Sequence, residues 1–420
     1  MKRIKRILKV LGPGFITGAA DDDASGVATY AQTGALFGYS QLWTVLFSFP
    51  FMVAIQEICA RIGLVTGKGL SGVIKHNYPK AILYFVVTIL LIANTVNIGA
   101  DLGAMAASAQ LVLGIPFIFL LIGMTILILA LEIFVSYPTY AKFLKYLTLS
   151  LLAYVIVAFV VKQNWLVIFK SIIIPHIVFS RDYILNIAAL LGTTISPYLF
   201  FWQADEEVEE ELRAHKLRFF GKGIPKINKK DVHEMRLDTT VGMLFSQLIT
   251  FFIIIAAAST LGAHGITSIQ TADQAALALR PIAGDFAYLL FATGIIGVGL
   301  IAVPVLAGSA SYAVSEAFNW KEGLNKKFKQ AHGFYGVMTF ATLIGLLVNF
   351  TPIKPFTMLY YTAILNSICA PLLMIFIMLI ANNKKIMGKY ANTIWSNAGG
   401  LGITIIMSIV SIFTIVTIIK

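Results

Sequence analysis

Three consecutive aspartates, Asp21, Asp22 and Asp23, interrupt a stretch of sequence that is otherwise apolar. Within a bilayer each buried charge costs about 2.5–3.5 kcal/mol even on insertion scales, so three in succession need something cationic nearby to offset them. Carboxylate, hydroxyl, carbonyl and water oxygens suit hard ions such as Mg²⁺ and Mn²⁺. The chemistry that these residues predict is therefore the binding of a cation.

A second polar interruption covers residues 192–197, which read Gly-Thr-Thr-Ile-Ser-Pro. A proline cannot donate a helical hydrogen bond, and in lipid the freed backbone groups must face protein or a cavity. We expect the chain to unwind here and at the aspartates. A simple kink is the competing interpretation of Pro197 taken alone.

Other acidic residues fall inside or beside apolar stretches. Asp101 lies among small residues and is a candidate proton acceptor, with an ion pair to Arg61 as the alternative. Glu57 precedes Arg61 by four residues, so these two are expected to pair on one helix, whereas Glu132 is interpreted as structural. The acidic run 205–211 is expected to form a solvated charged helix, with attraction of cations to the inner mouth as the alternative.

The elements that must position these residues are membrane helices. Of the 420 residues 58% are hydrophobic and only 12% are charged, which is more apolar surface than a soluble chain can hide. Stretches of about 20 apolar residues, the length needed to cross a bilayer, recur along the chain. We expect an all-α membrane protein with about eleven transmembrane helices. They cover approximately residues 12–35, 41–66, 81–113, 117–136, 143–161, 184–203, 237–262, 284–316, 331–349, 355–381 and 397–419.

The formal net charge of +12 is explained by topology rather than by nucleic acid binding. If the basic N-terminus is cytoplasmic, most lysines and arginines fall in cytoplasmic loops. This predicts a multi-pass protein of the cell inner (plasma) membrane, with its N-terminus inside and its C-terminus outside. The expected partners are the lipid bilayer and a metal ion, and no nucleic acid.

The sequence contains no catalytic pattern of the HExxH, GxSxG or phosphate-loop type. We therefore expect no enzyme and no cofactor, with any divalent metal ion bound as a substrate. The two interrupted stretches are the first members of two five-helix halves, and such a pair indicates a transporter built from inverted repeats. We expect one transmembrane transporter domain over 1–420, with repeats at about 12–161 and 184–381 and an additional helix at 397–419.

Two short motifs resemble a known family. Residues 12–15 read Gly-Pro-Gly-Phe and are followed by Asp23 and by Gly-Ala-Leu-Phe-Gly-Tyr at 34–39. Together with residues 56–67, Gln-Glu-Ile-Cys-Ala-Arg-Ile-Gly-Leu-Val-Thr-Gly, this pattern resembles the first two helices of the Nramp family of divalent metal transporters. The resemblance implies a LeuT-like fold with a 5+5 inverted repeat, and metal transport that is usually coupled to protons.

The site departs from the family pattern. Where the family has Asp-Pro-Gly-Asn, residues 23–26 read Asp-Ala-Ser-Gly, which keeps the carboxylate and loses the amide. Where the family has Ala-Thr-Val-Met-Pro-His, residues 193–198 read Thr-Thr-Ile-Ser-Pro-Tyr, and the glutamate expected three residues after Asp101 is Ala104. Thioether sulfur favours soft or borderline ions, so Ser196 in place of methionine should weaken discrimination against hard ions.

These residues give an expected ligand set for Mn²⁺, Fe²⁺ or Mg²⁺. Asp23 supplies the principal charge, backbone carbonyls and a hydroxyl complete the shell, and Gly26 marks a family ligand position without a side chain. Whether protons drive uptake, or the membrane potential alone, stays open because the family's histidine and glutamate are missing. The expected metal-site residues are Asp23, Ala20, Thr193, Ser196, Asp22, Gly26 and Asn366, and the expected proton-pathway residue is Asp101.

Two other functions stay open. A transporter of the same fold could carry an organic cation or an amino acid, although acids beside unwound helix ends disfavour a substrate carboxylate. Alternatively, the chain could sense metal in the membrane without transporting it. The expected mechanism of a transporter is alternating access, in which segments one and six rock with their neighbours against segments three, four, eight and nine.

Overall fold

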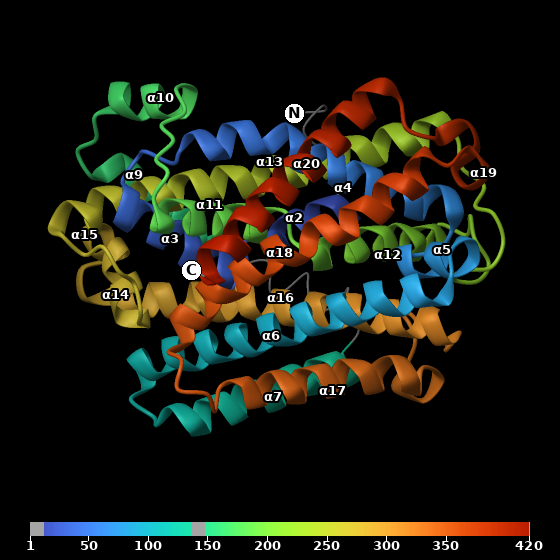
Figure 1. The fold of residues 1–420 in the computed structure, drawn as a ribbon. Coiled ribbons are helices and arrows are strands. Elements are labelled where there is room, and N and C mark those ends of the chain that lie inside the picture. The colour runs from blue at the N-terminus through green and yellow to red at the C-terminus, as the bar shows by residue number, and fades with distance from the viewer. Residues whose placement is uncertain (1–11, 136–147, 420) are drawn as a thin grey trace, which may run out of the picture.

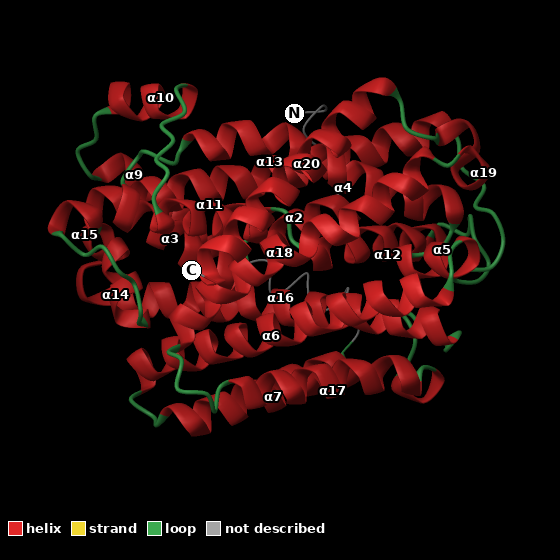
Figure 2. Ribbon diagram, viewed as in Figure 1, coloured by secondary structure: helices red, strands yellow, loops and turns green. Residues whose placement is uncertain are grey.

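The computed structural model describes residues 12–135 and 148–419, and within these ranges its regular elements are helices (Figures 1 and 2). The all-α class predicted from the sequence is therefore confirmed. The α-helices are α2 (Pro13–Asp21), α3 (Ala24–Phe37), α4 (Trp43–Thr66), α5 (Leu70–Asn77), α6 (Lys80–Leu113), α7 (Phe117–Phe134), α9 (Leu152–Val160), α10 (Trp165–Ile173), α11 (Arg181–Thr194), α12 (Pro197–Arg213), α13 (Lys229–Thr260), α14 (Ala272–Ala276), α15 (Arg280–Ala283), α16 (Ala287–Phe318), α17 (His332–Val348), α18 (Pro355–Asn382), α19 (Lys384–Met387) and α20 (Ile394–Ile419).

Eight helical stretches in the described ranges are long and apolar enough to cross a membrane, and α17 is a shorter apolar helix. The first expected segment is divided between α2 and α3, and the fifth, 143–161, begins outside the described residues. The number eleven therefore stays a prediction. The eight stretches are Trp43–Thr66, Lys80–Leu113, Phe117–Phe134, Arg181–Arg213, Lys229–His264, Ala272–Phe318, Pro355–Asn382 and Ile394–Ile419.

Both predicted interruptions are confirmed. Asp22 and Asp23 separate α2 from α3, and Ile195 and Ser196 separate α11 from α12. The second half of each broken helix has a local reason to begin where it does. Asp23 is the N-cap of α3, and Pro197 occupies the first turn of α12, where a missing N–H costs nothing.

The helices form two packed groups. α16 lies along α6, and α7 and α17 pack beside them at one edge of the molecule (Figure 1). In the other group, α13 packs against α2, α3 and α4, while α12 packs against α4. α18 bridges the groups because it contacts both α11 and α6. The two broken helices thus face the α6 and α16 layer from a separate bundle.

Glycines permit the closest helix contacts. A Cβ at Gly18 would lie 2.2 Å from the carbonyl oxygen of Gly242, so α2 and α13 touch backbone to backbone. A Cβ at Gly192 would lie 2.0 Å from the carbonyl oxygen of Ala363 on α18. The glycines of the eighth segment also admit close neighbours, since a Cβ at Gly299 would lie 2.4 Å from a methionine sulfur of α6.

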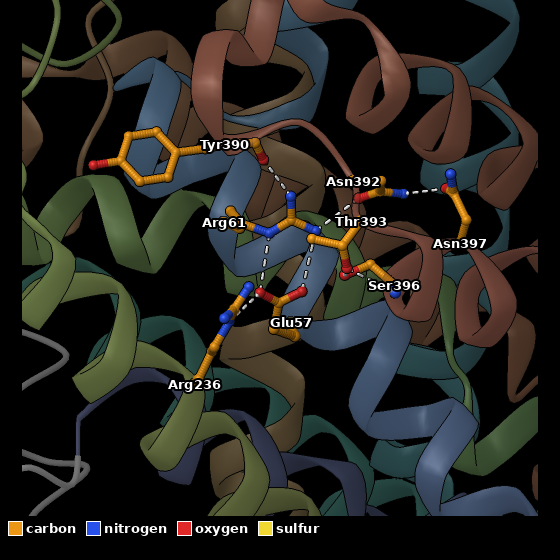
Figure 3. Close-up of polar contacts among 8 residues, drawn as sticks. All are labelled: Glu57, Arg61, Arg236, Tyr390, Asn392, Thr393, Ser396 and Asn397. Atoms are coloured by element: carbon orange, nitrogen blue, oxygen red, sulfur yellow. Dashed lines mark hydrogen bonds and ion pairs between the residues drawn. The ribbon is translucent and has the colours of Figure 1, made fainter.

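An ion-pair network ties α4 to α13 and to the segment before α20 (Figure 3). Arg61 Nε lies 3.0 Å from Glu57 Oε1, which confirms the expected pair, and Arg236 Nε lies 2.8 Å from the same oxygen. Arg61 also donates to the side chain of Asn392 and to the backbone carbonyl of Tyr390. The alternative that Arg61 pairs with Asp101 is wrong, because these partners occupy its guanidinium.

The acidic run 205–211 is helical, but the prediction that it is solvated is wrong. All of its acids except Glu210 are buried. The C-terminal half of α12 packs between α4 and α16, so its carboxylates face protein: Glu209 accepts hydrogen bonds from Tyr312 Oη at 2.8 Å and from Asn325 Nδ2 at 2.6 Å. The high number of acidic residues in this stretch of sequence did not indicate that other helices would cover them.

Candidate metal site

Asp23 is the centre of the site and is fully buried. Its Oδ1 accepts hydrogen bonds from Ser25 Oγ at 2.6 Å and from the backbone N–H of Gly26 at 2.7 Å. Its Oδ2 accepts from Asn97 Nδ2 at 3.2 Å, and Tyr198 Oη lies 3.4 Å from it. These four neighbouring groups are neutral, so they orient the carboxylate without balancing its charge.

The two carboxylate oxygens of Asp23 are held differently. The bonds to Oδ1 are short, whereas those to Oδ2 are longer than the usual 2.7–3.0 Å or so for such bonds. Tyr198 has one hydroxyl proton, and its shorter contact, 2.9 Å, is to the backbone carbonyl of Ala20. Asp23 Oδ2, Tyr198 Oη and the Ala20 carbonyl therefore converge, and Oδ2 is the oxygen that a cation can take.

The break in the sixth segment supplies two further groups. Thr193 Oγ1 lies 3.3 Å from Ser25 Oγ, which brings the two broken helices into contact beside Asp23. Ser196 Oγ lies 2.7 Å from the Thr193 carbonyl and 2.9 Å from the Gly192 carbonyl, and it donates its one proton there. Two groups expected as metal ligands, the Ser196 hydroxyl and the Thr193 carbonyl, thus bind each other in this structure.

Asp22 and Gly26 were expected to bind the metal ion, and in this structure each makes a different contact. Asp22 Oδ1 lies 3.3 Å from Ser246 Oγ on α13. Gly26 contributes its backbone N–H to Asp23 and has no side chain to reach a metal. Asp22 therefore shares a contact to Ser246 with Asp21.

Asp101 and Asn366 are both buried, on α6 and α18. Asp101 lies close enough to Asp23 for the two carboxylates to repel each other, and it is near the backbone N–H of Ser25. Among the described residues, no hydrogen bond joins Asn366 to Asp23, and its Nδ2 has no partner. The structure thus brings Asp101 close to Asp23 and shows no hydrogen bond from Asn366 to it within the described residues.

Three contributors were not assigned a site role from the sequence. Asn97 precedes Asp101 by four residues, so it lies on the same face of α6, and this spacing could have indicated it. Tyr198 directly follows the proline of the second break. Ser246 is one serine in the apolar helix α13, and no local pattern distinguishes it.

The donor set around Asp23 consists of oxygen. In the parts of the chain that the structure describes, no three His, Cys, Asp or Glu side chains come together in a way that could hold a metal ion. An ion at Asp23 would meet one carboxylate together with carbonyl, hydroxyl and water oxygens, a set that suits hard cations.

Two curated relatives cover nearly the whole chain. The "Divalent metal cation transporter MntH" of Klebsiella pneumoniae subsp. pneumoniae is 27% identical over 418 residues, which are 96% of this chain and 92% of that protein. The protein of the same name from Erwinia tasmaniensis is 25% identical over 409 residues, 95% of this chain and 92% of that protein. Both are transporters rather than enzymes.

Solved structures share the fold. A manganese transporter from Eremococcus coleocola superposes with a TM-score of 0.78 at 14% identity, covering 98% of this chain and 87% of that one. Mhp1, a nucleobase-cation-symport-1 family transporter, superposes with a TM-score of 0.60 at 12% identity, covering 97% and 90%. The LeuT-like architecture expected from the sequence is confirmed by these likenesses.

The family resemblance seen in the first two helices extends along the chain. The model of the family described as "Natural resistance-associated macrophage protein-like" matches residues 14–417, which include both breaks and every residue of the site. The chain belongs to the Nramp family.

Proposed function

We propose that this protein carries divalent metal cations across the membrane into the cytoplasm, and that the ion binds at Asp23. The observation that carries the proposal is a buried carboxylate at the junction of two broken helices, held by neutral donors only. Such a charge in a membrane protein needs a positive guest. The names of the MntH relatives support the same substrate class.

The donor set favours hard ions. Mg²⁺, Mn²⁺ and Fe²⁺ are the proposed substrates, because oxygen ligands surround Asp23 and Ser196 replaces a thioether. Mg²⁺ keeps part of its water shell at sites with few protein ligands, and one carboxylate with carbonyls and hydroxyls is such a site. Ser196 would have to release the carbonyls that it now bonds before it joined the shell.

Transport proceeds by alternating access around this site. The bundle of α2, α3, α4, α11, α12 and α13 moves against α6, α7, α16 and α17, which pack as a separate layer. Asp101 on α6 is the proposed proton acceptor, because it faces Asp23 across the boundary between these groups. The protein sits in the inner membrane with its N-terminus in the cytoplasm, as the distribution of basic residues favours.

Uptake of divalent ions into liposomes that contain the pure protein tests the proposal. We expect Mn²⁺ or Mg²⁺ uptake above that of protein-free liposomes, and we expect Asp23→Ala to reduce it to the protein-free level, because no other carboxylate occupies that position. Asp285→Ala, which removes an exposed carboxylate, is the matched control and should transport as the wild type does.

The outcomes separate the alternatives. Wild-type flux in a folded Asp23→Ala variant would refute the site. No flux of any divalent ion, with metal binding retained, would favour a membrane sensor, and flux of amines or amino acids alone would favour an organic-cation or amino acid transporter.

A further inference from the structure

The side chains of Asp21 and Asp22 have a hydrogen-bond partner different from those of Asp23. Asp23 is held by α6 and α12, whereas Ser246 Oγ of α13 lies 2.5 Å from Asp21 Oδ2 and 3.3 Å from Asp22 Oδ1. Both aspartates are fully buried, with 0% and 1% of their surface exposed. They form a separate acidic group against α13.

The hydrogen bonds of this group leave carboxylate oxygens without partners. A serine hydroxyl has one proton and cannot satisfy two carboxylates. Within the described residues, Asp21 Oδ1 and Asp22 Oδ2 have no hydrogen-bond partner although both are buried. A buried carboxylate in this state is strongly destabilising unless it binds a proton or a cation.

Two more hydroxyls lie near the acidic pair. Tyr30 of α3 is a neighbour of Asp21 and Asp22, and Thr250 is one helical turn beyond Ser246 on α13. In the described residues, neither hydroxyl has a hydrogen-bond partner. Tyr30 and Thr250 are both buried. Carboxylates and hydroxyls from α2, α3 and α13 thus surround one position, and a shell made of oxygen alone selects a hard cation.

We propose that Asp21, Asp22 and Ser246, with the hydroxyls of Tyr30 and Thr250, form a second cation site that takes a hard monovalent cation such as Na⁺. This site lies beside the metal position at Asp23 and shares none of its hydrogen-bond donors. With the divalent ion of the proposed function at Asp23, the carboxylates at 21–23 carry three formal negative charges against two positive ones, and one monovalent cation completes the balance.

A cation at this position would connect three helices. It joins the end of α2 to α3 and α13, all of which belong to the bundle that is proposed to move. A cation there stabilises this bundle as a unit, and by linkage its binding and that of the transported ion at Asp23 influence each other.

Thermal unfolding of the purified full-length protein in detergent, with divalent ions chelated, tests the site. The melting temperature is compared in NaCl and in choline chloride at equal ionic strength. We expect Na⁺ to raise the melting temperature of the wild type by about 2–4 °C. The increase should disappear in Asp21→Asn and Asp22→Asn, shrink in Ser246→Ala, and persist in Asp23→Ala and in Ser311→Ala, an equally buried serine of α16.

Ser246→Ala keeps the proposal testable if an aspartate variant does not fold. Equal melting temperatures of the wild type in Na⁺ and choline would overturn it, and so would a full Na⁺ effect in Ser246→Ala. An increase in Asp23→Ala that Mg²⁺ or Mn²⁺ produces and Na⁺ does not would overturn the monovalent assignment. Divalent flux without any Na⁺ effect would leave the proposed function intact, whereas a Na⁺ effect without divalent flux would remove only the proposed function.

Discussion

At the scale of single residues, Ser196 is the position where one side chain should decide between hard and softer ions. Its hydroxyl is turned back to the carbonyls of Gly192 and Thr193, so it offers little to a metal in this state. Ser196→Met places a polarisable sulfur at the break beside Asp23. We expect the preference for Cd²⁺ or Mn²⁺ over Mg²⁺ to rise by about 10-fold, because thioether sulfur binds softer ions better.

Competition for uptake into liposomes measures this change. Ser196→Ala is the control, because it removes the hydroxyl and adds no sulfur. If Ser196→Ala and Ser196→Met shift the preference equally, the effect comes from the loss of the hydroxyl and the argument from ligand softness fails.

Glu322, in the loop after α16, should make stability depend on pH. Burial, together with the neighbouring Glu316 carboxylate, raises the pKa of Glu322 from 4.5 to about 9, although Lys326 acts in the opposite direction. The folded protein therefore binds this proton more tightly than the unfolded chain. The stability that results is fully present below pH 4.5 or so and is lost as the pH rises to about 9.

Glu322→Gln is neutral throughout that window. We expect its melting temperature to fall less than that of the wild type between pH 5 and pH 9 or so, as followed by intrinsic fluorescence. Glu234→Gln, on the partly exposed start of α13, should keep the wild-type slope. Identical slopes for the wild type and Glu322→Gln would show that other buried acids carry the dependence.

The sequence was sufficient to propose Asp23 as a metal ligand but not to find its hydrogen-bond partners. Asp23 was predicted because a charge in an apolar stretch is costly wherever the chain folds. Asn97, Tyr198 and Ser246 come from three other helices, and only tertiary packing brings them to the aspartates. The contact of Asp22 with Ser246 was not predicted for the same reason, since the direction of a side chain on an unwound segment depends on the helix that packs against it.

At the scale of elements, the contact between α2 and α13 depends on the absence of side chains. A Cβ at Gly18 would lie 2.2 Å from the Gly242 carbonyl oxygen, and that neighbour is backbone that cannot rotate away. Asp238 of α13 also holds the start of α2, because it accepts from the N–H groups of Gly12, Gly14 and Phe15 at 2.9, 2.7 and 3.2 Å. The two helices are thus fixed along their length.

Gly18→Ala should therefore separate α2 from α13 and destabilise the protein by about 2–3 kcal/mol, with a lower melting temperature. Gly123→Ala on α7 is the matched control: no atom lies within 4 Å of its added Cβ, and alanine favours a helix over glycine. Unchanged stability of Gly18→Ala would mean that the helices tolerate a wider spacing.

Elements were predicted well where local chemistry controls them. Both breaks followed from residues that cannot continue a helix or must cap one, Asp23 and Pro197. The run at 205–211 was misjudged because its burial depends on α4 and α16, which are distant in sequence. Charge density along a chain says that a helix is polar, but not which of its faces other helices will cover.

At the scale of the whole molecule, hydropathy and the two paired breaks were enough to predict the fold class. Membrane spans are read reliably because each must satisfy its own backbone hydrogen bonds in lipid. The division into repeats at about 12–161 and 184–381 stays a prediction, and part of the first lies outside the described residues. The packing of the helices into two groups is a tertiary property. The family resemblance, rather than hydropathy, suggested it.

Movement of a divalent ion across the whole molecule is driven by the membrane potential. Two positive charges that move inward gain about 4.6 kcal/mol per 100 mV, enough for a roughly 2,000-fold concentration ratio at equilibrium. In liposomes that contain K⁺, valinomycin imposes an inside-negative potential, and we expect Mn²⁺ or Mg²⁺ uptake to rise with the size of that potential.

A pH-sensitive dye inside the liposomes reports proton movement in the same experiment. Acidification that accompanies uptake in the wild type and disappears in Asp101→Asn assigns the proton pathway to Asp101, and a steady internal pH leaves the potential as the driving force. Uptake that ignores the potential would contradict the net inward movement of charge, and with it the transport of an uncompensated divalent ion through the site at Asp23.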